Sequence, residues 1–276
     1  MNGGYTRLLA LLREMGSVAV AFSAGVDSTL LLQAAHQSLG DRAVTVTVRS
    51  AFVPQRELDA SAAFCAAAGV KQVFLDLDPL AVDGVAENPP DRCYRCKRAI
   101  FTGIAGTAAA LGLSCVAEGS NVDDLRDYRP GMRAIRELGV RSPLLEAGLT
   151  KAEIRTISRE IGLPTWDKPA MACLATRFET GQPLTFPELS RVEQAEAWLA
   201  AKGFRQLRVR VHGDLARLEL DTDGMERLRG PAAAQSVYEA LRGFGFRWVT
   251  VDLGGYRMGS MNLPCSAYHE SEQAGT

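Results

Sequence analysis

The chain has 276 residues, of which 47% are hydrophobic and 23% are charged, and this composition is typical of a folded globular protein rather than a disordered or fibrous one. Its 31 Lys and Arg residues nearly balance its 32 Asp and Glu residues, so the chain as a whole has no strong attraction to nucleic acid or to an anionic membrane. Membrane spans of about 18 apolar residues and a secretory signal are not evident. We therefore expect a cytoplasmic protein whose six cysteines are reduced or bound to metal.

The first 165 residues alternate apolar, β-branched runs with helical patterns. Val18 to Phe22, for instance, is a short apolar run that leads into Ser23-Ala24-Gly25, as a buried strand leads into a tight turn. Strands that alternate with helices pair in parallel through right-handed crossovers, so the pattern predicts a doubly wound, mostly parallel α/β sheet. The expected elements are strands at 18–22, 43–48, 73–77 and 114–117 and helices at 29–35, 54–68, 98–111 and 150–161.

The alternation of strand and helix patterns stops after residue 168. Residues 169–186 contain several Pro and Gly residues and show little periodicity, so we expect an ordered loop or linker there. A smaller C-terminal α+β domain should follow at 187–276, behind a first domain at 1–168. Its expected elements are a helix at 187–201, a hairpin of strands at 206–212 and 215–220, a helical region at 225–241 and a strand at 248–253.

The segment AFSAGVDSTLLL, residues 21–32, places small residues and an Asp between a buried strand and a helix. Backbone N–H groups at the start of such a helix can hold an anion, although a plain turn capped by Asp27 or Ser28 needs the same residue types. The whole segment resembles the S-G-G-x-D-S loop (PP-loop) of the ATP pyrophosphatases, which adenylate a substrate and release pyrophosphate. The resemblance implies an adenine nucleotide alpha hydrolase-like fold. It also implies ATP contacts at Ser23, Ala24, Gly25, Val26, Asp27 and Ser28.

One position departs from that pattern, because Ala24 stands where the ATP pyrophosphatases usually have a Gly. A backbone with positive φ, or a close approach of phosphate, would make the methyl group costly. In that case we expect weaker nucleotide binding rather than none.

A second polar segment, Glu118 to Asp124, follows the expected strand at 114–117. Open α/β sheets bind their ligands at this carboxyl edge of the strands. We expect Glu118 and Gly119 to contact ATP, and Asp123 and Asp124 to hold Mg²⁺ on the pyrophosphate. A solvated acidic turn is the alternative interpretation.

Four further segments resemble the LarE family of ATP-dependent sulfur transferases. They are NPPDRCYRCK at 88–97, EGSNVDDLRDYRPGMRAIRELGVRSPLLEAGLTKAEIR at 118–155, PAMACLATR at 169–177 and LGGYRMGSMN at 253–262. The resemblance spans nearly the whole chain. It implies that ATP adenylates a carboxylate of pyridinium-3,5-biscarboxylic acid mononucleotide, with release of pyrophosphate. A sulfur held by the protein then displaces AMP and leaves a thiocarboxylate for the nickel-pincer nucleotide cofactor.

The family has two sources of sulfur, which differ in the number of cysteines. In one, a single cysteine gives up its sulfur and becomes dehydroalanine; in the other, three cysteines hold a 4Fe-4S cluster that carries an extra sulfide. Cys173 matches the sulfur-bearing position, and Cys93 and Cys96 complete the three-cysteine pattern, so we favour the cluster. The alternatives are a sacrificial Cys173, plain buried thiols, and a zinc site, for which no fourth ligand is evident. The other cysteines fit packing or tail positions: Cys65, Cys115 and Cys265.

Cationic residues are needed to hold the phosphate and carboxylates of such a mononucleotide, and guanidinium groups suit both. Arg208 and Arg210 alternate on one face of the expected hairpin, and Arg257 lies in the loop after the last strand. Their positions in the resemblance imply contacts with the substrate phosphate. The solvated face of an amphipathic hairpin would show the same alternation.

Three further residues are catalytic candidates beside Cys173. Glu196 and Glu219 match acidic positions near the cysteine, where a general base or an orienting partner would act, or they are ordinary surface acids. Arg177 follows Cys173 closely enough in sequence to depress the pKa of the thiol.

The resemblance also implies partners: a homo-oligomer, which we expect to be a hexamer, and a nickel-inserting protein that receives the product. We expect no membrane or nucleic-acid partner. A tRNA-thiolating enzyme that combines the same loop with a cluster is the main alternative, but the balanced charge counts against it. An amidotransferase-like synthetase would give Cys173 no role. A non-catalytic nucleotide-binding module would not need the acids of the two loops, Asp27, Asp123 and Asp124.

Overall fold

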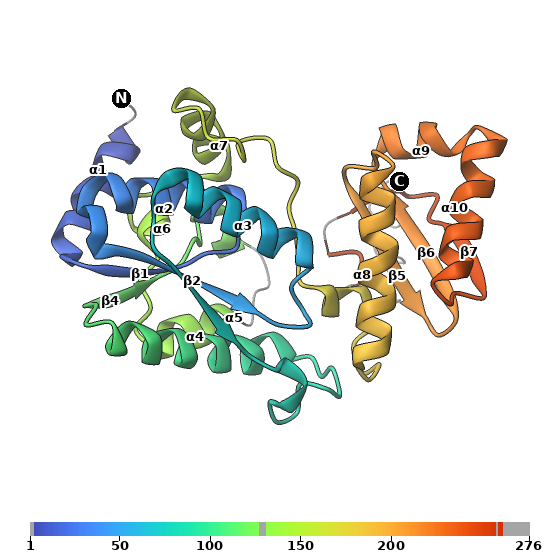
Figure 1. Ribbon diagram of the computed structural model, residues 1–276, viewed down its shortest axis with the longest axis horizontal. Coiled ribbons are helices and arrows are strands. Elements are labelled where there is room, and N and C mark those ends of the chain that lie inside the picture. The colour runs from blue at the N-terminus through green and yellow to red at the C-terminus, as the bar shows by residue number, and fades with distance from the viewer. Residues whose placement is uncertain (1–2, 127–130, 258, 262–276) are drawn as a thin grey trace, which may run out of the picture. The chain divides into compact units, whose positions relative to one another are not determined.

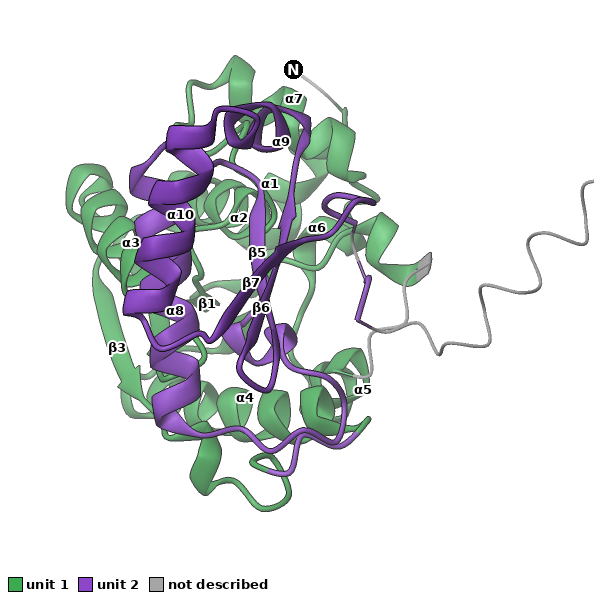
Figure 2. Ribbon diagram, turned by 90° about the vertical axis from the view of Figure 1, so that its right-hand side faces the viewer, with its two compact units in different colours: residues 1–86, 90–171 green, residues 87–89, 172–276 purple. Residues whose placement is uncertain are grey.

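A computed structural model describes residues 3–126, 131–257 and 259–261. Met258, Asn262 and Cys265 therefore lie outside the described residues. The chain forms two compact units, which are coloured separately in Figure 2. Unit 1 comprises residues 1–86 and 90–171, and unit 2 comprises residues 87–89 and 172–276. The main border between them, at residues 171 and 172, falls within the segment 169–186.

Unit 1 is built on a parallel four-stranded sheet in the order β3-β2-β1-β4. The strands are β1 (Val18–Ala21), β2 (Ala43–Arg49), β3 (Gln72–Asp76) and β4 (Cys115–Ala117). The helices are α1 (Gly3–Met15), α2 (Val26–Leu39), α3 (Gln55–Ala68), α4 (Arg92–Ala110), α5 (Gly131–Glu137), α6 (Pro143–Glu146) and α7 (Lys151–Glu160). Single 3-10 turns lie at η1 (Gly40–Arg42), η2 (Pro79–Ala81) and η3 (Val122–Arg126). Because β1 lies between β2 and β4, the strand order reverses beside it, which is where such sheets bind ligands.

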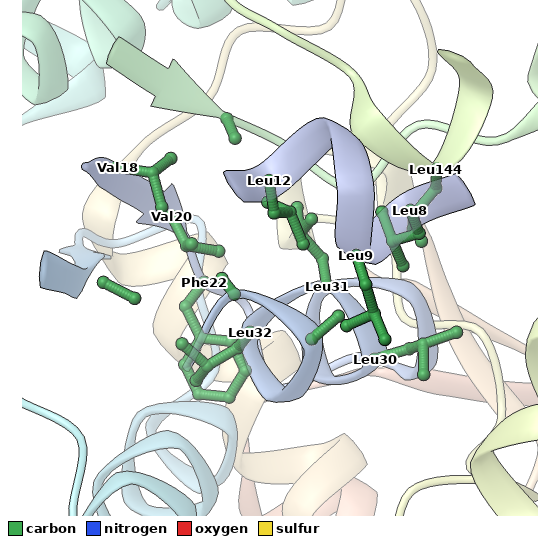
Figure 3. Close-up of a cluster of buried hydrophobic side chains, with 14 of the residues drawn as sticks. Leu8, Leu9, Leu12, Val18, Val20, Phe22, Leu30, Leu31, Leu32 and Leu144 are labelled. Carbon is green, nitrogen blue, oxygen red and sulfur yellow. The ribbon is translucent and has the colours of Figure 1, made fainter. Parts of the chain in front are cut away.

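Alternate residues of β1 enter two separate hydrophobic cores, as the two-residue period of a strand requires. Val18 and Val20 pack against the buried leucines of α1 and α2 (Figure 3). Ala19 belongs to the opposite core, together with Phe101 and Ile104 of α4. Helices therefore cover both faces of the sheet, with α1 and α2 on one and α4 and α5 on the other (Figure 1). The predicted doubly wound α/β fold is confirmed.

Unit 2 is a smaller α+β structure around a mixed three-stranded sheet in the order β5-β6-β7. Strands β5 (Leu207–His212) and β6 (Leu215–Leu220) form the predicted antiparallel hairpin, and β7 (Trp248–Val251) pairs in parallel with β6. The helices are α8 (Phe186–Ala201), α9 (Thr222–Leu228) and α10 (Pro231–Gly243), and η4 (Leu174–Arg177) is a 3-10 turn. The predicted helical region at 225–241 is two helices, because the chain breaks at Gly230-Pro231.

Helix α4 differs most from its predicted range, because it begins at Arg92 rather than at residue 98. Cys93 and Cys96 therefore lie on its first two turns. The short helices α5 and α6 are additional to the predicted elements. Within residues 3–126, 131–257 and 259–261, no helix combines the length and the apolar character needed to cross a membrane.

Candidate active site

The loop between β1 and α2 curls around the hydroxyl group of Ser28. The backbone N–H groups of Gly25 and Ser23 donate to Ser28 Oγ at 3.2 and 3.4 Å, and Ser23 Oγ lies 3.2 Å from the same atom. Gly25 is the N-cap of α2, which is 14 residues long. Converging N–H donors at the N-terminus of a helix form the kind of nest that binds phosphate. The hydroxyl of Ser28 marks the point at which these donors converge.

Ala24 lies in the left-handed region of the backbone map, with φ of +53°. A non-glycine residue in this region costs about 1–2 kcal/mol, because Cβ approaches the following carbonyl oxygen. The side chain is 2% exposed, so the methyl group is packed inside the unit. The sequence allowed either an ordinary or a positive φ here, and the structure has the strained one.

The carbonyl group of Ala24 is held by a lysine from a distant part of unit 1. Lys168 Nζ donates to the Ala24 carbonyl oxygen at 2.9 Å and to Glu57 Oε2 of α3 at 2.6 Å. The side chains of Lys168 and Glu57 are 22% and 10% exposed. This contact therefore joins the strained loop to a partly buried ion pair.

Asp27 is held between the loop that follows β4 and the first residue of α7. Its carboxylate forms an ion pair with Lys151 of α7 and accepts from Asn121 Nδ2 at 3.2 Å. Lys151 is the first residue of α7, directly after Thr150, whose side chain forms a capping box with Glu153. The ends of β1 and β4 meet here as predicted for neighbouring parallel strands.

Gly119 allows this close approach of the two loops. A Cβ atom at Gly119 would lie 3.1 Å from the backbone nitrogen of Ser28 and 3.3 Å from Cβ of Asp27. Both separations are tight for a methyl group, so a side chain here would push aside the loop between β1 and α2, residues 23–28, which we call the phosphate loop. The site needs a glycine at 119 for the space, irrespective of its backbone conformation.

The three acids predicted in the second loop make different contacts. Glu118 is 7% exposed and accepts from Ser120 and Ser142, the latter at 2.5 Å. Asp124 is 9% exposed and accepts from the backbone N–H of Asn121 at 3.0 Å. Asp123 accepts from the backbone N–H of Lys151 at 2.7 Å. Buried Glu118 and Asp124 exclude a wholly solvated acidic turn. Their contacts stabilise the loop that carries Asn121.

Cys93 and Cys96 are three residues apart on α4 and therefore share one face of the helix. Both thiols are partly buried, and Arg92 Nη2 lies 3.4 Å from Cys93 Sγ. Two thiolates in this spacing fit part of a ligand set for iron or zinc. Cys173, the third predicted ligand, belongs to unit 2. Among the described residues, no three His, Cys, Asp or Glu side chains are grouped as a metal site.

Arg177 holds the backbone that carries Cys173. It is completely buried, and its Nη1 donates to the carbonyl oxygens of Ala172 and Cys173 at 2.8 and 3.0 Å. The guanidinium also donates to both carboxylate oxygens of Glu196 of α8, each at 2.8 Å. Glu196 in turn accepts from the backbone N–H of Val209 in β5 at 3.0 Å. Arg177 thus fixes the cysteine loop by its backbone.

The Arg177–Glu196 pair stays ionised in spite of its burial. Burial favours the neutral form of each group, but their mutual attraction outweighs it, so the pKa of Glu196 is lowered and that of Arg177 is raised. The interpretation of Glu196 as a surface acid is wrong, since its exposed fraction is 1%. The same holds for Glu219, whose exposed fraction is 0%.

Arg208 and Arg210 lie on the buried face of the hairpin. Their exposed fractions are 3% and 4%, so the interpretation of this face as solvated is wrong. Arg210 donates to Glu219 Oε2 at 2.8 and 3.0 Å and to the carbonyl oxygen of Thr176 at 2.7 Å. Arg208 lies over the ring of Tyr256, 5.1 Å from its centre.

Arg208 has an unusual charge environment. Burial, with the repulsion of Arg177, lowers the pKa of Arg208 to about 10, and the attraction of Glu196 only partly opposes this. The third predicted arginine, Arg257, is half-exposed and lies 3.7 Å from Asp252. The positive charge of Arg208 would attract an anion placed beside it.

Comparison with known proteins agrees with the motifs. No family model matches the chain. It is 37% identical over 258 residues to the pyridinium-3,5-bisthiocarboxylic acid mononucleotide synthase of Lactiplantibacillus plantarum, with 92% of each chain covered. The chain belongs to the LarE family. This family relationship makes it an enzyme, since the curated relative is a synthase.

Two other relatives come from other organisms and are uncharacterized proteins. An uncharacterized protein of Synechocystis is 39% identical over 249 residues, which are 90% of this chain and 93% of that protein. An uncharacterized protein of Methanocaldococcus jannaschii is 27% identical over 240 residues, or 87% and 90% of the two chains. In each case the alignment covers most of both chains.

Sequence reasoning missed four polar residues of this LarE-family site: Glu57, Asn121, Lys151 and Lys168. Asn121 and Lys151 lie inside a motif quoted for the family, and the Thr150 cap could have located Lys151 at the start of a helix. Glu57 and Lys168 are 111 residues apart, and no local pattern predicts that they meet. Only the folded chain brings them to the phosphate loop.

Proposed function

We propose that this protein is an ATP-dependent sulfur transferase that converts a carboxylate of pyridinium-3,5-biscarboxylic acid mononucleotide into a thiocarboxylate. The observation that carries this proposal is the 37% identity, over 92% of both chains, to a synthase named for the bisthiocarboxylate product. The phosphate-binding geometry of the Ser23–Ser28 loop supports the use of ATP.

In the first step, the loop and the N-terminus of α2 bind the phosphates of ATP. Asp123 and Asp124 would hold Mg²⁺, which supplies positive charge against the pyrophosphate. A substrate carboxylate oxygen attacks the α-phosphorus, and the bond from that phosphorus to the bridging oxygen breaks. Pyrophosphate leaves with the electron pair, and the products are pyrophosphate and an acyl adenylate. Lys151, paired with Asp27, places a further cation at the loop.

The buried arginines of unit 2 suit the substrate's phosphate. Arg208 and Arg210 lie on one face of β5, and burial and the repulsion of Arg177 lower the pKa of Arg208 to about 10. A phosphate dianion beside Arg208 would offset that repulsion, because bonds between charged groups strengthen on burial. Arg257 is the more exposed third candidate.

In the second step, a sulfur nucleophile attacks the acyl carbon of the adenylate. The carbon–oxygen bond to AMP breaks, AMP leaves with the electron pair, and a carbon–sulfur bond remains. Cys93, Cys96 and Cys173 would hold a 4Fe-4S cluster, which supplies a transferable sulfide when bound. In the alternative, Cys173 itself attacks. A base then removes its Cα proton while the Cβ–Sγ bond breaks, which releases the thiocarboxylate and leaves dehydroalanine.

Turnover by anaerobically purified protein tests this proposal. With ATP, Mg²⁺ and the biscarboxylate mononucleotide, we expect AMP, pyrophosphate and a product heavier by the replacement of oxygen with sulfur. Absence of pyrophosphate would overturn the proposal, and salt-dependent binding of tRNA would favour a tRNA-thiolating enzyme instead.

Cysteine variants then separate the two sulfur sources. Iron and acid-labile sulfide that are lost in Cys93→Ala and in Cys173→Ala, but kept in Cys115→Ala, would support the cluster. Cys115 is a suitable control because it packs beside the core of unit 1. Protein without iron, whose Cys173 loses the mass of hydrogen sulfide during turnover, would support the sacrificial thiol instead.

A further inference from the structure

The Lys168 ammonium group contacts the phosphate loop on a carbonyl oxygen, not on a side chain. That oxygen belongs to Ala24, and the same planar peptide unit carries the N–H group of Gly25. In a trans peptide, the C=O and N–H bonds point in opposite directions. A donor that fixes the carbonyl of Ala24 therefore also fixes the direction of the Gly25 N–H, which donates to Ser28 Oγ at the centre of the loop.

We propose that Lys168 is a positioning residue for ATP: by holding the Ala24 carbonyl, it fixes the Ala24–Gly25 peptide in the loop that binds the phosphates. This inference rests on the proposed ATP site. We do not propose that Lys168 touches the reacting atoms. Its effect passes through the Ala24–Gly25 peptide.

The conformation of Ala24 explains why this peptide needs a fixed partner. At φ of +53° an alanine is strained, and rotation of its peptide units toward the ordinary region would relieve the strain. Such a rotation would turn the Gly25 N–H away from Ser28 Oγ. A glycine at 24 would remain at this φ without strain and would depend less on the lysine.

Lys168 is itself well fixed for this role. Glu57 Oε2 accepts from its ammonium at 2.6 Å, and Arg155 Nη2 donates to its backbone carbonyl at 2.9 Å. Arg155 also donates to the carbonyl oxygen of Trp166 at 2.7 Å. Glu57 thus holds the ammonium group of Lys168, and Arg155 holds its backbone. A cation on the Ala24 carbonyl also polarises the peptide and strengthens its N–H as a donor.

The test is a double-variant cycle on ATP affinity, measured by equilibrium dialysis with Mg²⁺ and without the second substrate. Lys168→Met should weaken ATP binding about tenfold in the natural chain, since a bond from a charged donor is lost. In an Ala24→Gly background the same change should weaken binding only about threefold, because glycine keeps the conformation unaided. Lys168→Arg should recover most of the affinity.

Two controls keep the result specific. Lys71→Met makes the same chemical change at an exposed lysine of unit 1 and should leave ATP affinity unchanged. Thermal unfolding shows whether each variant is folded. If Lys168→Met does not fold, Lys168→Gln replaces it in the cycle. In turnover assays, Lys168→Met should raise KM for ATP with a much smaller change in kcat.

Three outcomes would overturn the inference: an unchanged affinity in Lys168→Met, an equal loss in both backgrounds, or a loss confined to kcat. These outcomes differ from the results that would overturn the proposed function. Wild-type protein that binds no ATP, or binds ATP without forming pyrophosphate from the mononucleotide, would overturn the proposed function. The cycle still tests Lys168 in the second of these cases, because it measures binding alone.

Discussion

The phosphate loop of unit 1 and the charged core of unit 2, the two anion sites proposed above, offer an anion different physical means of binding. The loop presents backbone N–H groups, whose direction depends on the conformation of one strained residue, Ala24. The charged core presents guanidinium groups, which are buried against Glu196 and Glu219. Backbone donors bring no net charge to bury. Buried ion pairs cost several kcal/mol of desolvation, which their partners must offset.

This difference predicts how the two regions respond to substitution. Changes in the charged core should affect the free energy of unfolding, because they leave a charge buried without its partner. Changes in the phosphate loop should affect ligand affinity more than stability, because they alter the direction of a few donors. Substitutions in each region can therefore confirm or refute the distinction.

Arg177→Met should have the largest effect. It leaves the Glu196 carboxylate, 1% exposed, without its bidentate partner. Breaking a buried pair from one side costs about 3–5 kcal/mol, which urea denaturation would measure as a fall in the free energy of unfolding. The double variant Arg177→Met with Glu196→Leu should recover much of that loss, since the carboxylate left without Arg177 is removed as well. A loss below about 1 kcal/mol in the single variant would show that this buried pair contributes no more than an exposed ion pair does, which would contradict the prediction.

The same pair predicts a dependence of stability on pH. Burial alone would raise the pKa of Glu196, but Arg177 outweighs it, so the pKa in the folded protein lies below the ordinary value of 4.5. A lowered folded pKa contributes stability that is fully present above the unfolded pKa and is lost as pH falls through the folded value. Wild type should lose more stability below pH 4.5 than the double variant does. Parallel acid profiles would contradict this.

Arg208→Met should have a smaller effect on stability and a clear effect on binding. Burial already penalises this cation, as its pKa of about 10 indicates, so its removal should lower the free energy of unfolding less than Arg177→Met does. Loss of a bond between charged groups should weaken binding of the mononucleotide by about 1.5–3 kcal/mol, measured by calorimetry. The dephosphorylated nucleoside is the control ligand and should bind both proteins equally. An equal loss for both ligands would show that Arg208 does not contact the phosphate.

Much of unit 1 was predictable because its signals are local. The apolar run at Val18–Ala21 and the small residues after it determine a strand and a turn, and the Thr150 cap determines the start of a helix. Alternation in the hairpin correctly placed Arg208 and Arg210 on one face. It could not tell whether that face is solvated, because burial depends on how α8 and the loop around Cys173 pack against the strand, which alternation within the strand does not determine.

The contacts that complete the two regions were not predictable for the same reason. Lys168 meets Glu57 and Ala24 only after the chain has folded, across 111 and 144 residues. Asn88, in the short stretch that belongs to unit 2, accepts from the backbone N–H of Gly181 at 2.7 Å and is 2% exposed. Nothing in the local sequence distinguishes such residues from ordinary loop residues. Local patterns thus predict elements, whereas the partners of isolated polar residues require the tertiary structure.

Ala24→Gly should have the smallest effect of these variants. Glycine removes a strain of about 1–2 kcal/mol from the loop, but its freedom in the unfolded chain offsets about 0.4–1 kcal/mol of that gain. The free energy of unfolding should therefore rise by about 1.6 kcal/mol at most. ATP affinity should change less than about threefold, because Lys168 already holds alanine in the conformation that glycine adopts freely. A gain of about tenfold or more, measured by equilibrium dialysis, would show instead that the methyl group obstructs the phosphates directly.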